Sequence, residues 1–69
     1  MESKVKIVKQ LEELLKLTRA GEDIFLLAYQ KDENGEEFVN IHYKDDYIRK
    51  VCVTADSGIA IIHDVLKMI

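Results

Sequence analysis

The chain has 69 residues, of which 48% are hydrophobic and 33% charged, and its formal net charge is −3. This balance is typical of a globular domain and excludes a disordered or membrane-spanning chain, and so short a chain has room for one domain with a small core. The only cysteine, Cys52, excludes an internal disulfide. No stretch approaches the roughly 20 apolar residues of a spanning helix or has the pattern of a signal peptide, so we expect a cytoplasmic protein without membrane contact.

The first element is predicted to be an amphipathic helix over residues 4–19. Its apolar residues recur at helical spacing within an arc of about 120°: they are Ile7, Val8, Leu11, Leu14, Leu15 and Thr18. Ser3 can cap the start of this helix, and Gly21 is placed to end it. Glu12 and Lys16 are four residues apart and can form an ion pair on its surface.

Residues 24–31 and 37–44 are predicted to form a β-hairpin around Asn34-Gly35. This dipeptide favours a two-residue type I′ turn, which needs a positive φ at both positions. That loop sets the register and places Leu27 opposite His42. The predicted apolar face holds Ile24, Leu26, Ala28, Val39, Ile41 and Tyr43, and the mixed face holds Phe25, Leu27, Tyr29, Lys31, Phe38, Asn40, His42 and Lys44.

A third strand is predicted over about residues 47–54, antiparallel to the second because the connection is short. A two-residue loop of Asp45 and Asp46 would place Val51 and Val53 on the mixed face. The same loop would place Lys50 on the buried face. Either Lys50 extends to the sheet edge or a bulge shifts the strand, and the sequence leaves both alternatives open.

The last helix is predicted over about residues 57–69, capped by Asp56 or Ser57. Its apolar residues cover an arc of about 180°, against about 120° for the first helix: they are Ile59, Ile61, Ile62, Val65, Leu66, Met68 and Ile69. The sequence therefore predicts a single α+β domain of order α-β-β-β-α, with a three-stranded antiparallel meander flanked by the two helices.

The wide apolar arc of the last helix indicates a surface that needs cover. Contiguous exposed apolar surface usually marks an interface, and a twofold dimer would bury one patch against its copy. The candidate dimer interface comprises Ile61, Val65, Met68, Phe25, Leu27 and Phe38. The alternative is that the two helices cover these side chains within one chain.

No motif of the sequence indicates catalysis or cofactor binding. His42, His63 and Cys52 lack the spacing of a zinc site, and His63 and Asp64 are neighbours that point in different directions on a helix. Cys52 lies in the apolar segment VCV and is expected to be an inert small hydrophobe. We therefore expect a protein that is not an enzyme and has no metal, no cofactor and no catalytic residue.

Acidic residues concentrate around the predicted hairpin turn. Residues 22–37 contain six acidic side chains and a single basic one. Glu33, Glu36 and Glu37 are candidates for docking on a basic partner, and a solvated loop is the alternative. The first functional hypothesis is therefore a small non-catalytic interaction module or regulator, of the accessory or phage type, which acts through self-association and binding of a protein partner.

The second functional hypothesis is single-stranded nucleic-acid binding on the sheet. The candidate face combines aromatic and basic side chains: Tyr29, Lys31, His42, Lys44, Tyr47 and Arg49. Residues 36–69 resemble the single-strand-binding domains of the positive cofactor four type, a likeness that implies a curved antiparallel sheet followed by a dimerising C-terminal helix. The acidic balance of the chain disfavours phosphate binding.

Overall fold

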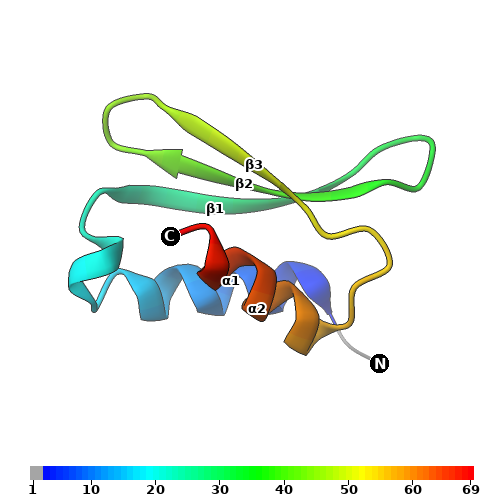
Figure 1. Ribbon diagram of the computed structural model, residues 1–69, viewed down its shortest axis with the longest axis horizontal. Coiled ribbons are helices and arrows are strands. Elements are labelled where there is room, and N and C mark those ends of the chain that lie inside the picture. Colours follow the sequence, from blue (N-terminus) through cyan, green and yellow to red (C-terminus); the bar gives the residue numbers. More distant parts are fainter. Residues whose placement is uncertain (1–2) are drawn as a thin grey trace.

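The chain folds into one antiparallel sheet with both helices on the same face (Figure 1). The structure, a computed structural model, describes residues 3–69. Its elements are helix α1 (Lys4–Leu15), a 3₁₀ turn η1 (Arg19–Gly21), strands β1 (Ile24–Lys31), β2 (Glu37–Tyr43) and β3 (Ile48–Cys52), and helix α2 (Gly58–Lys67). The predicted α-β-β-β-α order is confirmed, and the strands follow one another in the sheet as they do in the sequence.

Helix α1 begins where the sequence predicts and ends earlier. The Ser3 hydroxyl accepts a hydrogen bond from the Lys6 N–H at 3.3 Å, as a helix cap does. The helix stops at Leu15 because the Thr18 hydroxyl donates to the Leu15 carbonyl at 2.7 Å and the chain turns into η1. Gly21 then passes so close to α1 that an added Cβ would lie 2.0 Å from the Leu15 carbonyl oxygen. Only glycine fits at this position.

The β1–β2 loop is one residue longer than predicted. The Asp32 N–H donates to the Glu36 carbonyl at 2.9 Å and closes a three-residue loop. Within this loop only Gly35 has a positive φ, of 84°, so the two-residue type I′ turn is wrong. Leu27 therefore lies opposite Ile41 and not His42, and this slip by one residue moves the side chains of β1 to the other face of the sheet.

A bulge at Phe25 returns the start of β1 to the predicted face. The register shifts between Ile24 and Leu26, so Phe25 is the extra residue. Ile24 is buried as expected, whereas Leu26 and Ala28 lie on the face away from the helices, which we call the outer face. The helix-covered inner face carries Ile24, Leu27, Tyr29, Val39, Ile41, Tyr43, Val51 and Val53.

The β2–β3 loop repeats the same construction. The Tyr43 N–H donates to the Tyr47 carbonyl at 2.8 Å, and Asp46 takes the left-handed conformation with a φ of 70°. The longer loop pairs Val51 with Val39 and places Lys50 opposite Asn40 on the outer face. Neither an extended buried lysine nor a bulge in β3 is needed.

Helix α2 completes the core on the inner face. The Ser57 hydroxyl accepts from the Ala60 N–H at 3.2 Å and caps its start. Ile61 and Val65 are both 0% exposed. They pack with apolar residues of α1 and of the inner face: Val8, Leu11, Leu15, Ile24, Leu27, Val39, Ile41, Val51 and Val53. No element of the described chain covers the outer face (Figure 1).

Candidate interaction surfaces

The residues predicted to form a dimer interface do not share one surface. Ile61, Val65 and Leu27 belong to the core of the chain itself. Phe25 is exposed at the β1 bulge, and Met68 is partly exposed after the last turn of α2. The sixth residue, Phe38, lies on the outer face beneath Lys50, whose Nζ is 4.3 Å from the ring centre. The predicted centre of the interface is therefore inside the protein.

The residues predicted to bind nucleic acid are divided between the two faces of the sheet. Tyr29 and Arg49 lie on the inner side, where Arg49 Nη1 donates to the Met68 carbonyl at 2.9 Å. His42 lies on the outer face, and Lys31 is exposed near the acidic loop. The remaining pair, Lys44 and Tyr47, belongs to the β2–β3 hairpin. The structure therefore does not bring the six together as one binding face.

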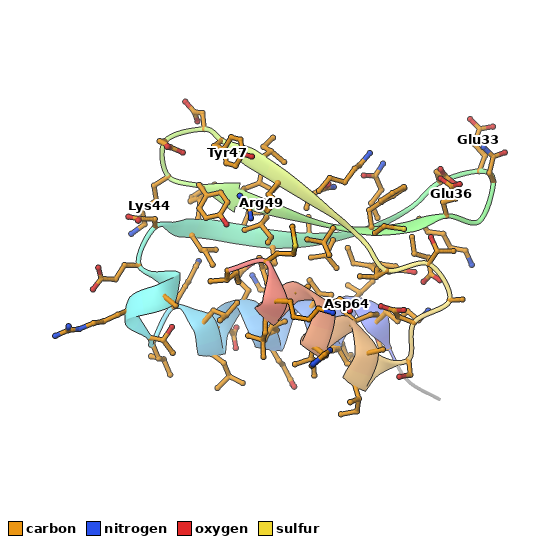
Figure 2. All side chains as sticks on the ribbon, in the orientation of Figure 1. Glu33, Glu36, Lys44, Tyr47, Arg49 and Asp64 are labelled. Atoms are coloured by element: carbon orange, nitrogen blue, oxygen red, sulfur yellow. The ribbon has the colours of Figure 1, made fainter. Side chains whose placement is uncertain are left out.

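Two of the three predicted tip residues lie at the tip. Glu33 and Glu36 are exposed in the β1–β2 loop, at the opposite end of the sheet from Lys44, Tyr47 and Arg49 (Figure 2). The Asp32 carboxylate organises this loop by accepting from the Asn34 and Glu36 N–H groups, each at 2.9 Å. The third residue, Glu37, is only 6% exposed and points into the protein, so it is unable to serve in a docking tip.

Glu37 joins four separate parts of the fold. Its carboxylate accepts from Lys4 Nζ of α1 at 2.7 Å and from the Tyr29 hydroxyl of β1. It also accepts from the Ala55 N–H at 3.0 Å, in the connection between β3 and α2. Ala55 has a positive φ of 62°, which is uncommon for a residue other than glycine. The contacts of Glu37 hold this strained connection against the sheet.

The same contacts shift the protonation of both groups. The pKa of Glu37 is lowered from 4.5 to about 2, first by the hydrogen bond from Lys4 and then by those from Tyr29 and Ala55. The hydrogen bond to Glu37 raises the pKa of Tyr29 to about 12. Shifts of this size often mark active sites, but structural networks also cause them. At Glu37 each donor is a structural partner.

Glu12 covers the free edge of β1. Its Oε1 accepts from the Leu27 N–H at 3.0 Å, a donor that points away from β2. Its Oε2 lies 3.1 Å from Lys9 Nζ and 3.5 Å from Lys16 Nζ, so the predicted pair with Lys16 is present. Burial raises the pKa of Glu12, but the Leu27 N–H and the two lysines outweigh burial and lower it overall. Helix α1 is thereby fastened to the edge of the sheet.

Asp56, just before α2, is less well satisfied. Its Oδ2 is buried without a hydrogen-bond donor among the described residues. The neighbouring carboxyl group of Asp64 raises the pKa of Asp56, and burial adds to the rise. A proton shared between the two carboxyl groups relieves their repulsion. This pair is close to the Glu37 junction but has too few partners to define a binding site.

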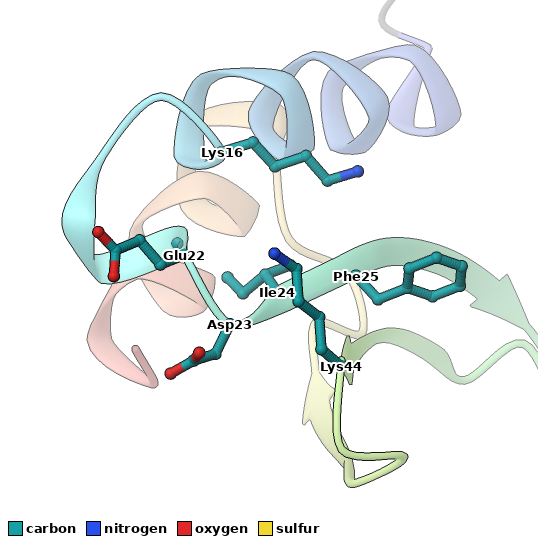
Figure 3. A pocket seen from close by; sticks show the side chains of 7 residues that line it. Lys16, Glu22, Asp23, Ile24, Phe25 and Lys44 are labelled. Atoms are coloured by element: carbon teal, nitrogen blue, oxygen red, sulfur yellow. The ribbon is translucent and has the colours of Figure 1, made fainter.

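Two open hollows lie at the end of the sheet away from the acidic loop. The first, of about 570 Å³, is lined by Lys16, Gly21, Glu22, Asp23, Ile24, Phe25 and Lys44. In it Lys16 and Lys44 extend from opposite sides, while Glu22 and Asp23 occupy another rim (Figure 3). The second hollow, of about 620 Å³, adjoins it and includes Tyr47 and Arg49. In the first hollow two ammonium groups are balanced by two carboxylates, so it has no net charge to select a ligand.

The metal-ligating residue types stay apart. Among residues 3–69 no three histidine, cysteine or carboxylate side chains are grouped so that they could hold a metal ion. Cys52, expected to be an inert small hydrophobe, is exposed on the outer side of β3, with its Sγ 3.5 Å from the Thr54 hydroxyl.

Several large apolar side chains are exposed on α2 and at the C-terminal end of α1. Leu14 lies in the last turn of α1 and Leu17 in the turn that follows it, and they are 63% and 84% exposed. Ile59 and Leu66 of α2, seven residues apart, are 75% and 47% exposed. Seven residues make nearly two helical turns, so Ile59 and Leu66 lie on one side of α2. Helices α1 and α2 contact each other and lie in one layer against the sheet (Figure 1). We name four exposed residues of this layer, Leu14, Leu17, Ile59 and Leu66, the helix-layer patch.

Part of this patch was visible in the sequence. Ile59 and Leu66 contribute to the wide apolar arc of the last helix, and this arc is divided in the structure between the core and the exterior. Leu17 was not part of the predicted buried stripe of the first helix. An apolar residue outside such a stripe is expected to be exposed. Leu14 was predicted to be buried and is exposed because the stripe of α1 is narrower than expected.

Neither helix of the described part of the chain has the length and apolar character to cross a membrane. No protein-family model, no curated protein and no solved structure matches this chain.

Proposed function

We propose that this protein is a small interaction module that acts by binding and not by catalysis, and that it self-associates through the helix-layer patch. The observation that carries the proposal is the exposure of four large aliphatic side chains on the outside of the helices. Groups of exposed apolar side chains rimmed by polar residues usually mark a protein interface. The strongly shifted carboxylate of Glu37 supports binding over catalysis, because structural contacts already occupy it.

The small core supports self-association. Short chains bury a limited share of their surface and often gain stability from a second copy. The helix layer extends along the longest and shortest dimensions of the molecule, 32 and 18 Å. A face of this size gives roughly 600 Å² per partner, near the lower limit of specific interfaces. We therefore expect a twofold dimer that exchanges with monomer.

The experiment is sedimentation equilibrium over a range of micromolar to millimolar protein. We expect the mass to rise from 8.0 kDa toward twice that value. Leu14→Glu should abolish the rise because it places a charge in the patch. The matched control is Val5→Glu: Val5 is also 63% exposed, but its separation of nine positions from Leu14 places it on the opposite side of α1.

Two results would contradict the proposal. The first is a wild-type protein that stays at 8.0 kDa at the highest concentration. The second is an equal effect of Leu14→Glu and Val5→Glu, because a dimer through the helix-layer patch requires the two variants to differ. Both side chains are exposed, so neither change should unfold the protein, and circular dichroism checks this.

A further inference from the structure

The two edges of the sheet differ in their protection. On the β1 edge, α1 lies alongside and the Glu12 carboxylate accepts from the outward Leu27 N–H. Strand β3 forms the other edge (Figure 1). An uncovered strand edge is a template for pairing with another chain, and proteins usually cover or charge it.

The hydrogen-bond pattern identifies the free groups of β3. Tyr47 and Val53, which flank β3, both bond to β2 through their backbones, with N···O distances of 2.8 and 2.9 Å. Backbone groups alternate along an antiparallel strand, so Arg49 and Val51 also point toward β2. The N–H and C=O groups of Ile48, Lys50 and Cys52 then point outward, and no residue among 3–69 is recorded as their partner.

The charge of the β3 edge indicates which kind of segment can bind there. Arg49 and Lys50 are consecutive, so their side chains lie on opposite faces and an added strand would meet a cation on either face. The ion pairs recorded among residues 3–69 use Lys4, Lys9 and Lys16, and none uses Arg49 or Lys50. A second copy paired about Lys50 would place two ammonium groups directly opposite each other, which is destabilising.

We infer that the β3 edge binds an extended acidic segment of a partner protein, which adds to the sheet as a fourth antiparallel strand. Its backbone pairs with Ile48, Lys50 and Cys52, and its carboxylate side chains face Lys50 on the outer face. Main-chain hydrogen bonds give affinity in this mode of recognition and the alternate side chains give specificity. This surface is separate from the helix-layer patch, and its test does not depend on the dimer.

The probe is a blocked peptide of alternating valine and glutamate, and an equal-length peptide of alternating valine and lysine is its control. Both are titrated into ¹⁵N-labelled protein and followed by amide chemical shifts and hydrogen exchange. With the glutamate peptide we expect the amides of Ile48, Lys50 and Cys52 to shift and to exchange roughly tenfold more slowly. With the lysine peptide we expect no change.

Reversal of the charge at Lys50 tests whether this residue causes the preference for the glutamate peptide. Lys50→Glu should exchange the preference, so that the lysine peptide binds and the glutamate peptide does not. Lys31→Glu makes the same change on the exposed end of β1 and should leave the preference unaltered. Both side chains are exposed, and the amide spectrum of each variant shows whether it is folded.

The remaining outcomes overturn the inference. Equal shifts with both peptides would exclude charge selection, and shifts confined to the helices or absent at millimolar peptide would exclude strand addition at β3. Slow exchange of the Ile48, Lys50 and Cys52 amides in concentrated protein without peptide would assign the edge to a second copy. A monomeric protein that binds the glutamate peptide at β3 would remove the proposed dimer and leave this inference standing.

Discussion

Among residues 3–69 two glutamates are buried, Glu12 and Glu37, and they connect the fold in different ways. Glu12 reaches one backbone donor across the chain, Leu27, and takes its other partners from its own helix. All the partners of the Glu37 carboxylate lie at least eight residues away, in α1, β1 and the connection to α2. One carboxylate fastens a helix to a strand edge, whereas the other holds four segments together. Two equally buried glutamates can therefore differ in how much they contribute to the stability of the fold.

Glu37→Ala should cause the largest loss of stability. The change leaves the Lys4 ammonium, the Tyr29 hydroxyl and the Ala55 N–H without their acceptor, and unsatisfied partners cost more than the contact itself. We expect the urea midpoint to fall further than for Glu12→Ala, with some unfolded protein present without urea. Glu36→Ala, at the exposed neighbouring position, is the control and should have the midpoint of the wild type. Equal midpoints for Glu37→Ala and Glu36→Ala would show that the junction is not important for stability.

Glu12→Ala should cost less, about 1–3 kcal/mol, the range for one buried donor left unsatisfied. The loss should be local, so the Leu27 amide should exchange with solvent faster than its neighbours in β1. Glu13→Ala is the matched control because Glu13 is exposed on the same helix, and its effect should lie within about 0.5 kcal/mol. If Glu12→Ala matched Glu37→Ala in urea, the distinction between the two glutamates would fail.

The pH dependence of unfolding should separate the two glutamates again. The folded pKa of Glu37 is about 2 against the usual 4.5, so its stabilisation is complete above about pH 4.5 and is lost as the pH falls toward 2. We measure the thermal unfolding midpoint of each variant from pH 2 to 6. Glu37→Gln should reduce the fall of this midpoint at low pH more than Glu12→Gln does. The opposite order would contradict the comparison.

At alkaline pH the stability should change in the opposite direction, because Tyr29 stabilises the folded state only while its phenol is protonated. The folded pKa of Tyr29 is raised from 10.0 to about 12, so the protonated phenol favours the folded state. This stabilisation is present below pH 10 and lost as the pH rises to 12. Tyr29→Phe should remove that alkaline loss, and an unchanged midpoint profile between pH 10 and 12 would show that the hydrogen bond to Glu37 has no such role.

The smallest effect is expected at Asp56, which has a buried oxygen without a donor. Its raised pKa means that the ionised form is disfavoured in the folded protein, so the penalty is present at neutral pH, decreases as the pH falls through the folded pKa and is absent below the usual value of 3.8. Asp56→Asn should therefore raise stability at pH 7 by no more than about 0.5 kcal/mol, the scale of a surface change. The gain should vanish near pH 3. Asp23→Asn is the exposed control, and a loss of stability for Asp56→Asn would contradict this account.

The sequence predicted the order of the elements but not the register of the strands. Asn34-Gly35 correctly marked a turn, yet both two-residue and three-residue hairpin loops can place glycine in the left-handed region. The segment IFLLAYQ of β1 is apolar on both faces, so alternation gave no second constraint. The neighbouring strand β2 alternates clearly, and its inner residues Val39, Ile41 and Tyr43 were assigned correctly.

Local sequence patterns could not predict most of the polar contacts. Glu12 was recognised as a partner of Lys16 because helical spacing alone sets that pair. Its bond to Leu27 and the contacts of Glu37 join residues that are far apart in sequence, and they depend on a register that the sequence did not determine. Only the α2 part of the helix-layer patch, Ile59 and Leu66, was predictable as an apolar surplus, whereas Leu14 was predicted to be buried.

The order of strands in the sheet also bears on how the protein is made. Each strand pairs with the strand synthesised just before it, through a three-residue loop, so the whole sheet can form early at a small entropic cost. Helix α2 is synthesised after the sheet, and its Ile61 and Val65 belong to the same buried core as Val51 and Val53. Until it leaves the ribosome the nascent chain presents an apolar sheet surface, so a fragment ending at Ser57 should precipitate, which the solubility of that fragment can check.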